Sequence, residues 1–404
     1  MENLFKPIKI LGVVLLLTIL IAGLLLVNYQ YFVGHADVDE FRDHWDAARA
    51  FLVGDKNPFS EIAASPIQPM TIEGQDELFA ANSRMVAPIY AELLFIPFAL
   101  IENYLTARVA WMLVLELSIM AAVWFSFQIL DWHPKPLLFS TFLVFSTLWF
   151  PSVQSVTKGS LTIIAFFLLI AALSAIRAHR DDLAGIFMAL STIHPQTMFL
   201  MIILLILWAL FQRRMQFLLW FFGAGMALIL LGMLLIPSWP LQYMGALLSH
   251  FRSGPLSTIH ASLIAWLPGI GHNFGKLIEI LVMIALVWGW WMARMQRYRV
   301  LVWAACITII LTLWMTSFND LSMLVMLLIV FALIFSVWVG RWPQFGPWAA
   351  IIGMFILTVG SWLFFSQNTE MSLQMYSIFI FLPVFLLIAM KWVQWWYLRF
   401  PVIQ

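Results

Sequence analysis

The residues best suited to chemistry are acidic and lie near the N-terminus. Ten of the 20 acidic residues fall between positions 37 and 77, beside only three basic residues. A positioned carboxylate can accept a proton from an attacking hydroxyl group, and a group of carboxylates can bind a divalent ion. Alternatively, these acids form the hydrated face of a surface helix, where acids at the N-terminal end suit the helix dipole. The residue types alone leave both interpretations open.

The composition indicates that these acids belong to a membrane protein. The chain has 404 residues, of which 63% are hydrophobic and only 10% charged, and its mean hydropathy is +0.95. A soluble protein carries about 25% charged residues. The net charge of +1 offers no electrostatic footprint for nucleic acid. The single cysteine, Cys306, excludes a disulfide framework and a cysteine-clustered metal site.

Long apolar stretches predict an all-α polytopic membrane protein. A bilayer-spanning helix needs about 20 apolar residues, and the chain predicts about 12 transmembrane helices, in a range of roughly 10 to 13. The first span is read as a retained helix, because its apolar stretch is too long for a signal peptide. Two short spans could instead be one helix kinked at Pro195. The predicted spans are 8–28, 109–130, 136–150, 160–176, 183–193, 197–211, 217–236, 273–293, 300–317, 321–339, 347–366 and 372–391.

The distribution of basic residues predicts the orientation of these spans. With both termini in the cytoplasm, every dense run of Lys and Arg falls on the inner side, as the positive-inside rule requires. This holds only if the short, proline-bounded segment 88–101 does not cross. We therefore predict a single multi-pass unit in the plasma (inner) membrane. Its parts are a first extracytoplasmic loop (29–108), a core (109–236), a second extracytoplasmic loop (237–272) and C-terminal helices (273–404), with smaller outer connections at 151–159, 194–196, 318–320 and 367–371.

Within the first loop, the acids lie on a predicted helix. Phe41, Trp45, Ala48 and Leu52 recur at helical spacing with acids on the opposite face, and Gly54 is a suitable stop. This pattern is typical of an amphipathic helix on the membrane surface.

Further polar residues on the predicted outer side could complete a site. Each also has a structural interpretation: Arg108 can extend to the interface from the start of a span, and Asp320 can cap the following helix. His194 can bond a neighbouring helix, or line a cavity. The candidates are Arg108, Lys158, His194, Arg252, His260, Asn319 and Asp320.

The first-loop sequence resembles a known signature. The string EFRDHWDAAR (40–49), followed by Gly54 and Pro58, is similar to the first-loop motif of glycosyltransferase family 87, polyprenyl-phosphate-sugar-dependent enzymes of the C-type superfold. The stretches 87–100, 158–160 and 194–196 also resemble family motifs, and the likeness covers roughly residues 10–215. There are departures: Glu40 stands where aspartate is usual, His44 replaces an aromatic residue, and His194 replaces a lysine.

The resemblance implies transfer of a sugar, mannose or similar, from a polyprenyl-phosphate donor to an extracytoplasmic glycolipid or glycan acceptor. Glu40, Asp39 or Asp43 would be the base, and no metal or other cofactor is required, although the acids leave a divalent ion open. Arg108, Lys158, His194 and Arg252 would bind the donor phosphate, while His260, Asn319 and Asp320 would line the acceptor site or cavity. The alternatives are a secondary transporter of about 12 spans, which should show matched halves, and a non-catalytic lipid-binding assembly subunit.

Overall fold

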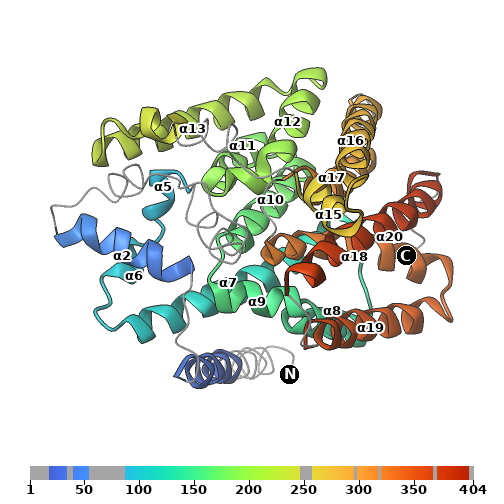
Figure 1. Ribbon diagram of the computed structural model, residues 1–404, viewed down its shortest axis with the longest axis horizontal. Helices are drawn as coiled ribbons and strands as arrows, with labels where there is room; N and C mark the ends of the chain where they lie inside the picture. Colours follow the sequence, from blue (N-terminus) through green and yellow to red (C-terminus); the bar gives the residue numbers. More distant parts are fainter. Residues whose placement is uncertain are drawn as a thin grey trace, which may run out of the picture.

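The computed structural model describes residues 18–33, 40–53, 87–245, 257–294, 298–316, 320–366 and 371–399. Every regular element in these residues is a helix, which confirms the all-α prediction (Figure 1). After the helix Thr18–Val33, the elements are α2 (Glu40–Val53), α5 (Ile89–Glu92), α6 (Ile96–Ala99), α7 (Tyr104–Ile129), α8 (Pro136–Leu148), α9 (Phe150–Lys158), α10 (Thr162–Arg177), α11 (Asp181–Leu190), η2 (Ser191–Ile193), α12 (Pro195–Phe211), α13 (Met215–Leu235), α15 (Thr258–Trp266), α16 (Gly271–Ala293), α17 (Tyr298–Met315), η3 (Leu321–Leu327), α18 (Leu328–Arg341), α19 (Gly346–Ser366) and α20 (Met371–Arg399).

Within the described residues, seven helical stretches are long and apolar enough to cross a membrane, and the bent pair α8–α9 is an eighth candidate. They are α7, α13, α16, α17, the continuous stretch formed by η3 and α18, α19 and most of α20. Each predicted span overlaps a helix, although the first is described only from Thr18. The total of about 12 spans stays a prediction. α11 and α12 are separate helices joined through η2, so a single helix kinked at Pro195 is not what forms.

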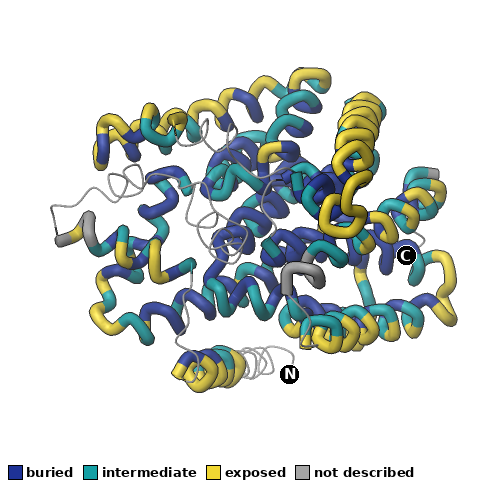
Figure 2. The backbone as a smooth tube through the Cα atoms, viewed as in Figure 1, coloured by how far each residue is buried: buried dark blue, intermediate teal, exposed yellow. Residues whose placement is uncertain are grey.

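Burial divides the helices into an inner and an outer set (Figure 2). In the most apolar stretch of Leu321–Arg341, 83% of the residues are buried, and in that of α17 the share is 72%. In the most apolar stretch of α19, only 11% of the residues are buried. α13 and α16 also present large apolar side chains outward. Water would penalise such surfaces, and lipid would not. The exposed apolar faces of the outer helices therefore identify an integral membrane protein.

α2 forms where the pattern predicted it and packs its aromatic face inward. Phe41, Trp45 and Ala48 are buried, whereas Arg42 and Asp46 are exposed. Trp45 Nε1 donates to the carbonyl of Phe98 in α6, the second of the two short non-crossing turns α5 and α6. These turns have four residues each, far fewer than the ~20 needed to cross a bilayer. α2 is thus fixed to the segment that precedes α7.

Two connections predicted as loops contain helices. Residues 151–159 form α9, which bends away from α8 by 51°. Pro151 is tolerated because it lies in the first turn, where the missing N–H has no helical partner to lose. The loop predicted at 237–272 contains α15, whose N-cap is Ser257.

Gly159 ends α9 at the point where α2 approaches. Its φ is +80°, the left-handed conformation that glycine adopts most readily, and its carbonyl accepts from Trp111 Nε1 at 3.0 Å. A Cβ at this position would lie 2.8 Å from Phe41 Cβ. Gly159 therefore allows the first residues of α2 to lie against the C-terminal end of α9.

Replacing Gly159 by alanine is expected to destabilise the fold by at least about 1 kcal/mol, since the left-handed conformation alone costs that much for an L-residue. The collision with Phe41 adds to this and displaces the neighbouring Glu40. Thermal unfolding in detergent measures the loss. Gly223→Ala on α13 is the control, because a Cβ there meets nothing within 4 Å. Equal midpoints for the two variants would contradict this account of Gly159.

Candidate functional site

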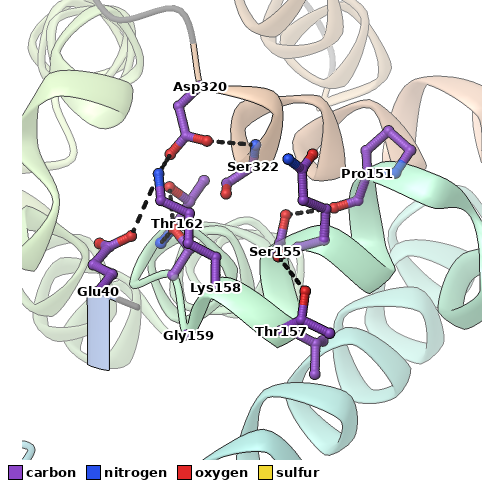
Figure 3. Close-up of polar contacts among 12 residues, drawn as sticks. Glu40, Pro151, Ser155, Thr157, Lys158, Gly159, Thr162, Asp320 and Ser322 are labelled. Carbon is purple, nitrogen blue, oxygen red and sulfur yellow. Dashed lines mark hydrogen bonds and ion pairs between the residues drawn. The ribbon is translucent and has the colours of Figure 1, made fainter. Parts of the chain in front are cut away.

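The centre of the candidate site is a lysine between two carboxylates. Lys158 Nζ lies 3.0 Å from Asp320 Oδ2 and 3.9 Å from Glu40 Oε2 (Figure 3). All three side chains are partly buried, with 14% of Glu40, 25% of Asp320 and 30% of Lys158 exposed. Such partial burial leaves the groups accessible while weakening solvent screening between them.

Three distant segments bring these groups together. Glu40 is the first residue of α2, Lys158 lies in the last turn of α9, and Asp320 is the N-cap of η3. Asp320 Oδ1 accepts from the backbone N–H of Ser322 at 3.0 Å, so the predicted capping role is confirmed. Burial opposes ionisation of Asp320, but Lys158 and the Ser322 bonds outweigh it and hold the pKa of Asp320 below its usual value.

A second pair, which the sequence did not single out as a site, lies beside Glu40. His44 Nδ1 is 2.8 Å from Glu92 Oε1, and its ring stacks on Phe95 with centroids 4.5 Å apart. Burial opposes the charged form of His44, but Glu92 and the acids of α2 outweigh it and raise the pKa of His44 to about 8. The one signal for this pair was Glu92, an acidic residue within the apolar segment 88–101, whereas His44 stands among charged residues on its helix.

His194 approaches the same group from the η2–α12 turn. Its Nδ1 lies 3.0 Å from Thr197 Oγ1, within the first turn of α12. Burial lowers the pKa of His194, and the nearby Glu40 and Asp320 only partly offset this, so the ring is neutral at pH 7. The turn is connected to α5 through Tyr90, whose hydroxyl lies 2.8 Å from Thr192 Oγ1. Three of the predicted site residues, Lys158, His194 and Asp320, thus gather around Glu40.

Arg108 holds the C-terminal end of the helix that carries Lys158. The guanidinium is fully buried and donates to the carbonyls of Val156 (3.3 Å) and Thr157, in the last turn of α9. It also lies over the rings of Phe32 and Phe41, at 5.1 and 5.5 Å from their centroids. These contacts hold the C-terminal end of α9, and with it Lys158. The donor-phosphate role of Arg108 stays a prediction.

Arg108→Met is expected to destabilise the protein by about 1–3 kcal/mol, because it leaves buried carbonyls of α9 without their donor. The matched control is Arg49→Met. Arg49 also donates to a carbonyl, that of Glu102 at 3.3 Å, but in an exposed position. We expect a clearly lower unfolding midpoint for the first variant only; a similar drop in both would show that burial of Arg108 is not what matters.

His260 belongs to a different cluster, between α15 and α16. Its Nε2 lies 2.9 Å from His272 Nδ1, and its Nδ1 lies 3.3 Å from Glu279 Oε1. Ser257 also donates to that oxygen. The elements holding this cluster differ from those holding Glu40 and Lys158, so its role in an acceptor site or cavity stays a prediction.

Of the remaining candidate site residues, one is described by the structure and three are not. Asp43 is exposed on α2, one residue before His44. Asp39, Arg252 and Asn319 lie outside the described residues. Among the described residues, no group of three or more His, Cys, Asp or Glu side chains is arranged to hold a metal ion. The expected independence of metals and other cofactors stays a prediction.

Comparison with known proteins identifies the family. The family model for glycosyltransferase family 87 matches residues 87–317, more than half of the chain. The match includes Glu92, Lys158 and His194, while Glu40 precedes it and Asp320 follows it. No curated protein and no solved structure matches the chain. The exposed apolar helices and the family match together show a membrane glycosyltransferase, and the chain belongs to glycosyltransferase family 87.

Proposed function

We propose that the protein transfers a sugar, mannose or a similar one, from a polyprenyl-phosphate donor to a glycolipid or glycan acceptor on the extracytoplasmic side of the membrane. The observation that supports this is the convergence of Glu40, Lys158 and Asp320 from three segments (Figure 3). A carboxylate and an ammonium group side by side suit the two charges that the transfer creates. The acceptor hydroxyl loses a proton, and the leaving lipid phosphate gains negative charge.

Glu40 is better suited to the role of base than Asp320. Asp320 has both oxygens engaged, one with Lys158 and one with the N–H of Ser322. Glu40 Oε2 is 3.9 Å from Nζ, beyond hydrogen-bonding distance, so the carboxylate can accept a new hydrogen bond without first breaking one to Lys158. Asp39 and Asp43 remain the alternatives on the same segment.

Lys158 is the proposed contact for the donor phosphate, with His194 beside it. An ammonium group is a compact point charge suited to phosphate oxygens. The neutral His194 can donate one hydrogen bond without adding charge. In this assignment the acceptor hydroxyl approaches Glu40 while the phosphate leaves toward Lys158.

Sugar transfer is tested with purified protein in lipid vesicles, supplied with polyprenyl-phosphate sugars and extracted membrane glycolipids. Mass spectrometry should show a glycolipid heavier by one sugar, and the same species should be missing from cells without the gene. Accumulation of a solute in sealed vesicles without any covalent product would instead indicate the transporter. Donor binding without turnover would indicate the non-catalytic subunit.

The side of the membrane is tested by labelling a cysteine at Glu102, which is exposed between α6 and α7. The native Cys306 is buried and should stay silent. A membrane-impermeant thiol reagent applied to intact cells is expected to label Glu102→Cys. Labelling only after the membrane is opened would place the site in the cytoplasm and would contradict a donor that enters from the outer leaflet.

A further inference from the structure

The His44–Glu92 pair connects the helix that carries the proposed base to the segment before α7. His44 lies on α2 and Glu92 on α5, and their side chains are only 13% and 8% exposed. The His44 ring is nearly parallel to that of Phe95, at 8° between planes. Hydrogen bonding in the ring plane and stacking on the ring face together fix both the position and the orientation of the imidazole.

This pair also fixes the rotation of α2 about its axis. Glu40 and His44 are four residues apart, so they lie on the same face of the helix, one turn from each other. A rotation of α2 that moved Glu40 away from Lys158 would pull His44 off Phe95 and out of reach of Glu92. The pair therefore resists the motion that would disassemble the candidate site.

The pair needs its positive charge. Glu92 Oε2 is buried and has no hydrogen-bond partner among the described residues. His44, on Oε1, is therefore the cation that compensates a carboxylate removed from water. Removing one partner of a buried ion pair leaves the other uncompensated, which is strongly unfavourable.

We propose that His44 and Glu92 form an ionic clamp that positions α2, so that the Glu40 carboxylate faces Lys158 during sugar transfer. Both are positioning residues, because they act through Glu40. This proposal rests on the proposed function in one respect, the assignment of Glu40 as the base.

The clamp should open at alkaline pH. The charged groups that face His44 are Glu92 on α5 and Glu40 and Asp43 on its own helix; His194, before α12, is a further titratable neighbour. Burial disfavours the imidazolium, but the three carboxylates outweigh it, so the pKa of His44 is raised from 6.5 to about 8. A group with a raised pKa holds its full stabilisation below its ordinary pKa and loses it as the pH rises through the raised value. The clamp is thus closed near pH 6.5 and lost above about pH 8.

The first test measures kcat and KM from pH 6 to pH 9 in His44→Ala, Glu92→Gln and the double variant. We expect each single change to lower kcat at pH 7 by about 10- to 100-fold, because small displacements of a reacting group have effects of this size. KM should change little, and the double variant should be no worse than either single one, as expected for residues that act as a pair. The alkaline fall in kcat near pH 8 should disappear in Glu92→Gln.

The control is Asp46→Asn, which removes an exposed ion pair with Arg42 on the same helix. It should leave kcat and the pH profile unchanged. Unchanged kcat in both His44→Ala and Glu92→Gln would overturn the clamp, and so would an alkaline fall that persists in Glu92→Gln.

The second test measures the position of α2 by chemical cross-linking and does not rely on activity. Cysteines are introduced as Glu40→Cys and Lys158→Cys and joined by a short bifunctional thiol reagent. Adding Glu92→Gln should lower the cross-linking yield severalfold, and an equal yield would overturn the clamp. If Glu40→Gln proves fully active while the cross-link still depends on Glu92, the base assignment fails and the clamp stands.

Discussion

Replacing Glu40 by glutamine is expected to lower the rate of sugar transfer by about 10²- to 10⁴-fold, the range typical of a lost general base. Glutamine preserves the shape of the side chain but cannot accept the acceptor's proton. Because Glu40 touches Lys158 only at 3.9 Å, the change should leave the fold and donor binding nearly intact. The expected signature is therefore a fall in kcat with little change in the unfolding midpoint.

The comparison variants make this result specific. Asp46 lies on the same helix, and 61% of its side chain is exposed. The Asp46→Asn variant should therefore keep full turnover. Asp39→Asn and Asp43→Asn test the two neighbouring acids. If Glu40→Gln and Asp43→Asn turn over normally and Asp39→Asn does not, the base is Asp39. Full turnover in all three would remove the base from the first loop altogether.

Lys158→Met is the second change with a large expected effect. It removes the cation between Glu40 and Asp320, and with it the stabilisation of charge on the leaving phosphate. Losing one such electrostatic contact in an active site lowers kcat by about 10²- to 10³-fold. Two carboxylates without a shared cation also repel, so we expect weaker donor binding and a higher KM for the donor. Both constants can be measured in one kinetic series.

The Lys158→Arg variant should have an activity between those of Lys158→Met and the wild type. It keeps the charge but changes its geometry, so it should retain more activity than Lys158→Met while falling short of the wild type. Lys276→Met, at an exposed position on α16, is the control and should be neutral. A Lys158→Met variant with normal kinetics would show that the lysine serves only to hold Glu40 and Asp320 together.

The sequence predicted the groups of the site better than their arrangement. Lys158, His194 and Asp320 were recognisable as polar residues at the outer ends of apolar spans, and Glu40 was recognisable through the family motif in the first loop. Their convergence was not predictable, since Lys158 and Asp320 are 162 residues apart and no local pattern specifies such a contact. The family resemblance indicated the first loop, although the family match itself begins at residue 87.

The errors have a physical origin as well. Residues 151–159 were predicted as an outer loop, yet they form α9, since proline is compatible with the first turn of a helix. The His44–Glu92 pair was not predicted because its partners are 48 residues apart and no local pattern links them. The donor-phosphate role of Arg108, implied by a family motif, stays a prediction, and the structure adds two bonds from Arg108 to carbonyls of α9 that no local pattern indicated.

The distance along the chain between Lys158 and Asp320 also has a consequence for biosynthesis. At a ribosomal rate of roughly 5–20 residues per second, the 162 residues that separate them take roughly 8–32 seconds to make. During that interval Glu40 and Lys158 have already been synthesised, while the second carboxylate is still missing. The nascent first half must therefore keep these charges hydrated at the bilayer edge. The site can close only once the C-terminal spans have been inserted, so truncated chains that end before Asp320 should remain inactive however well their early helices integrate.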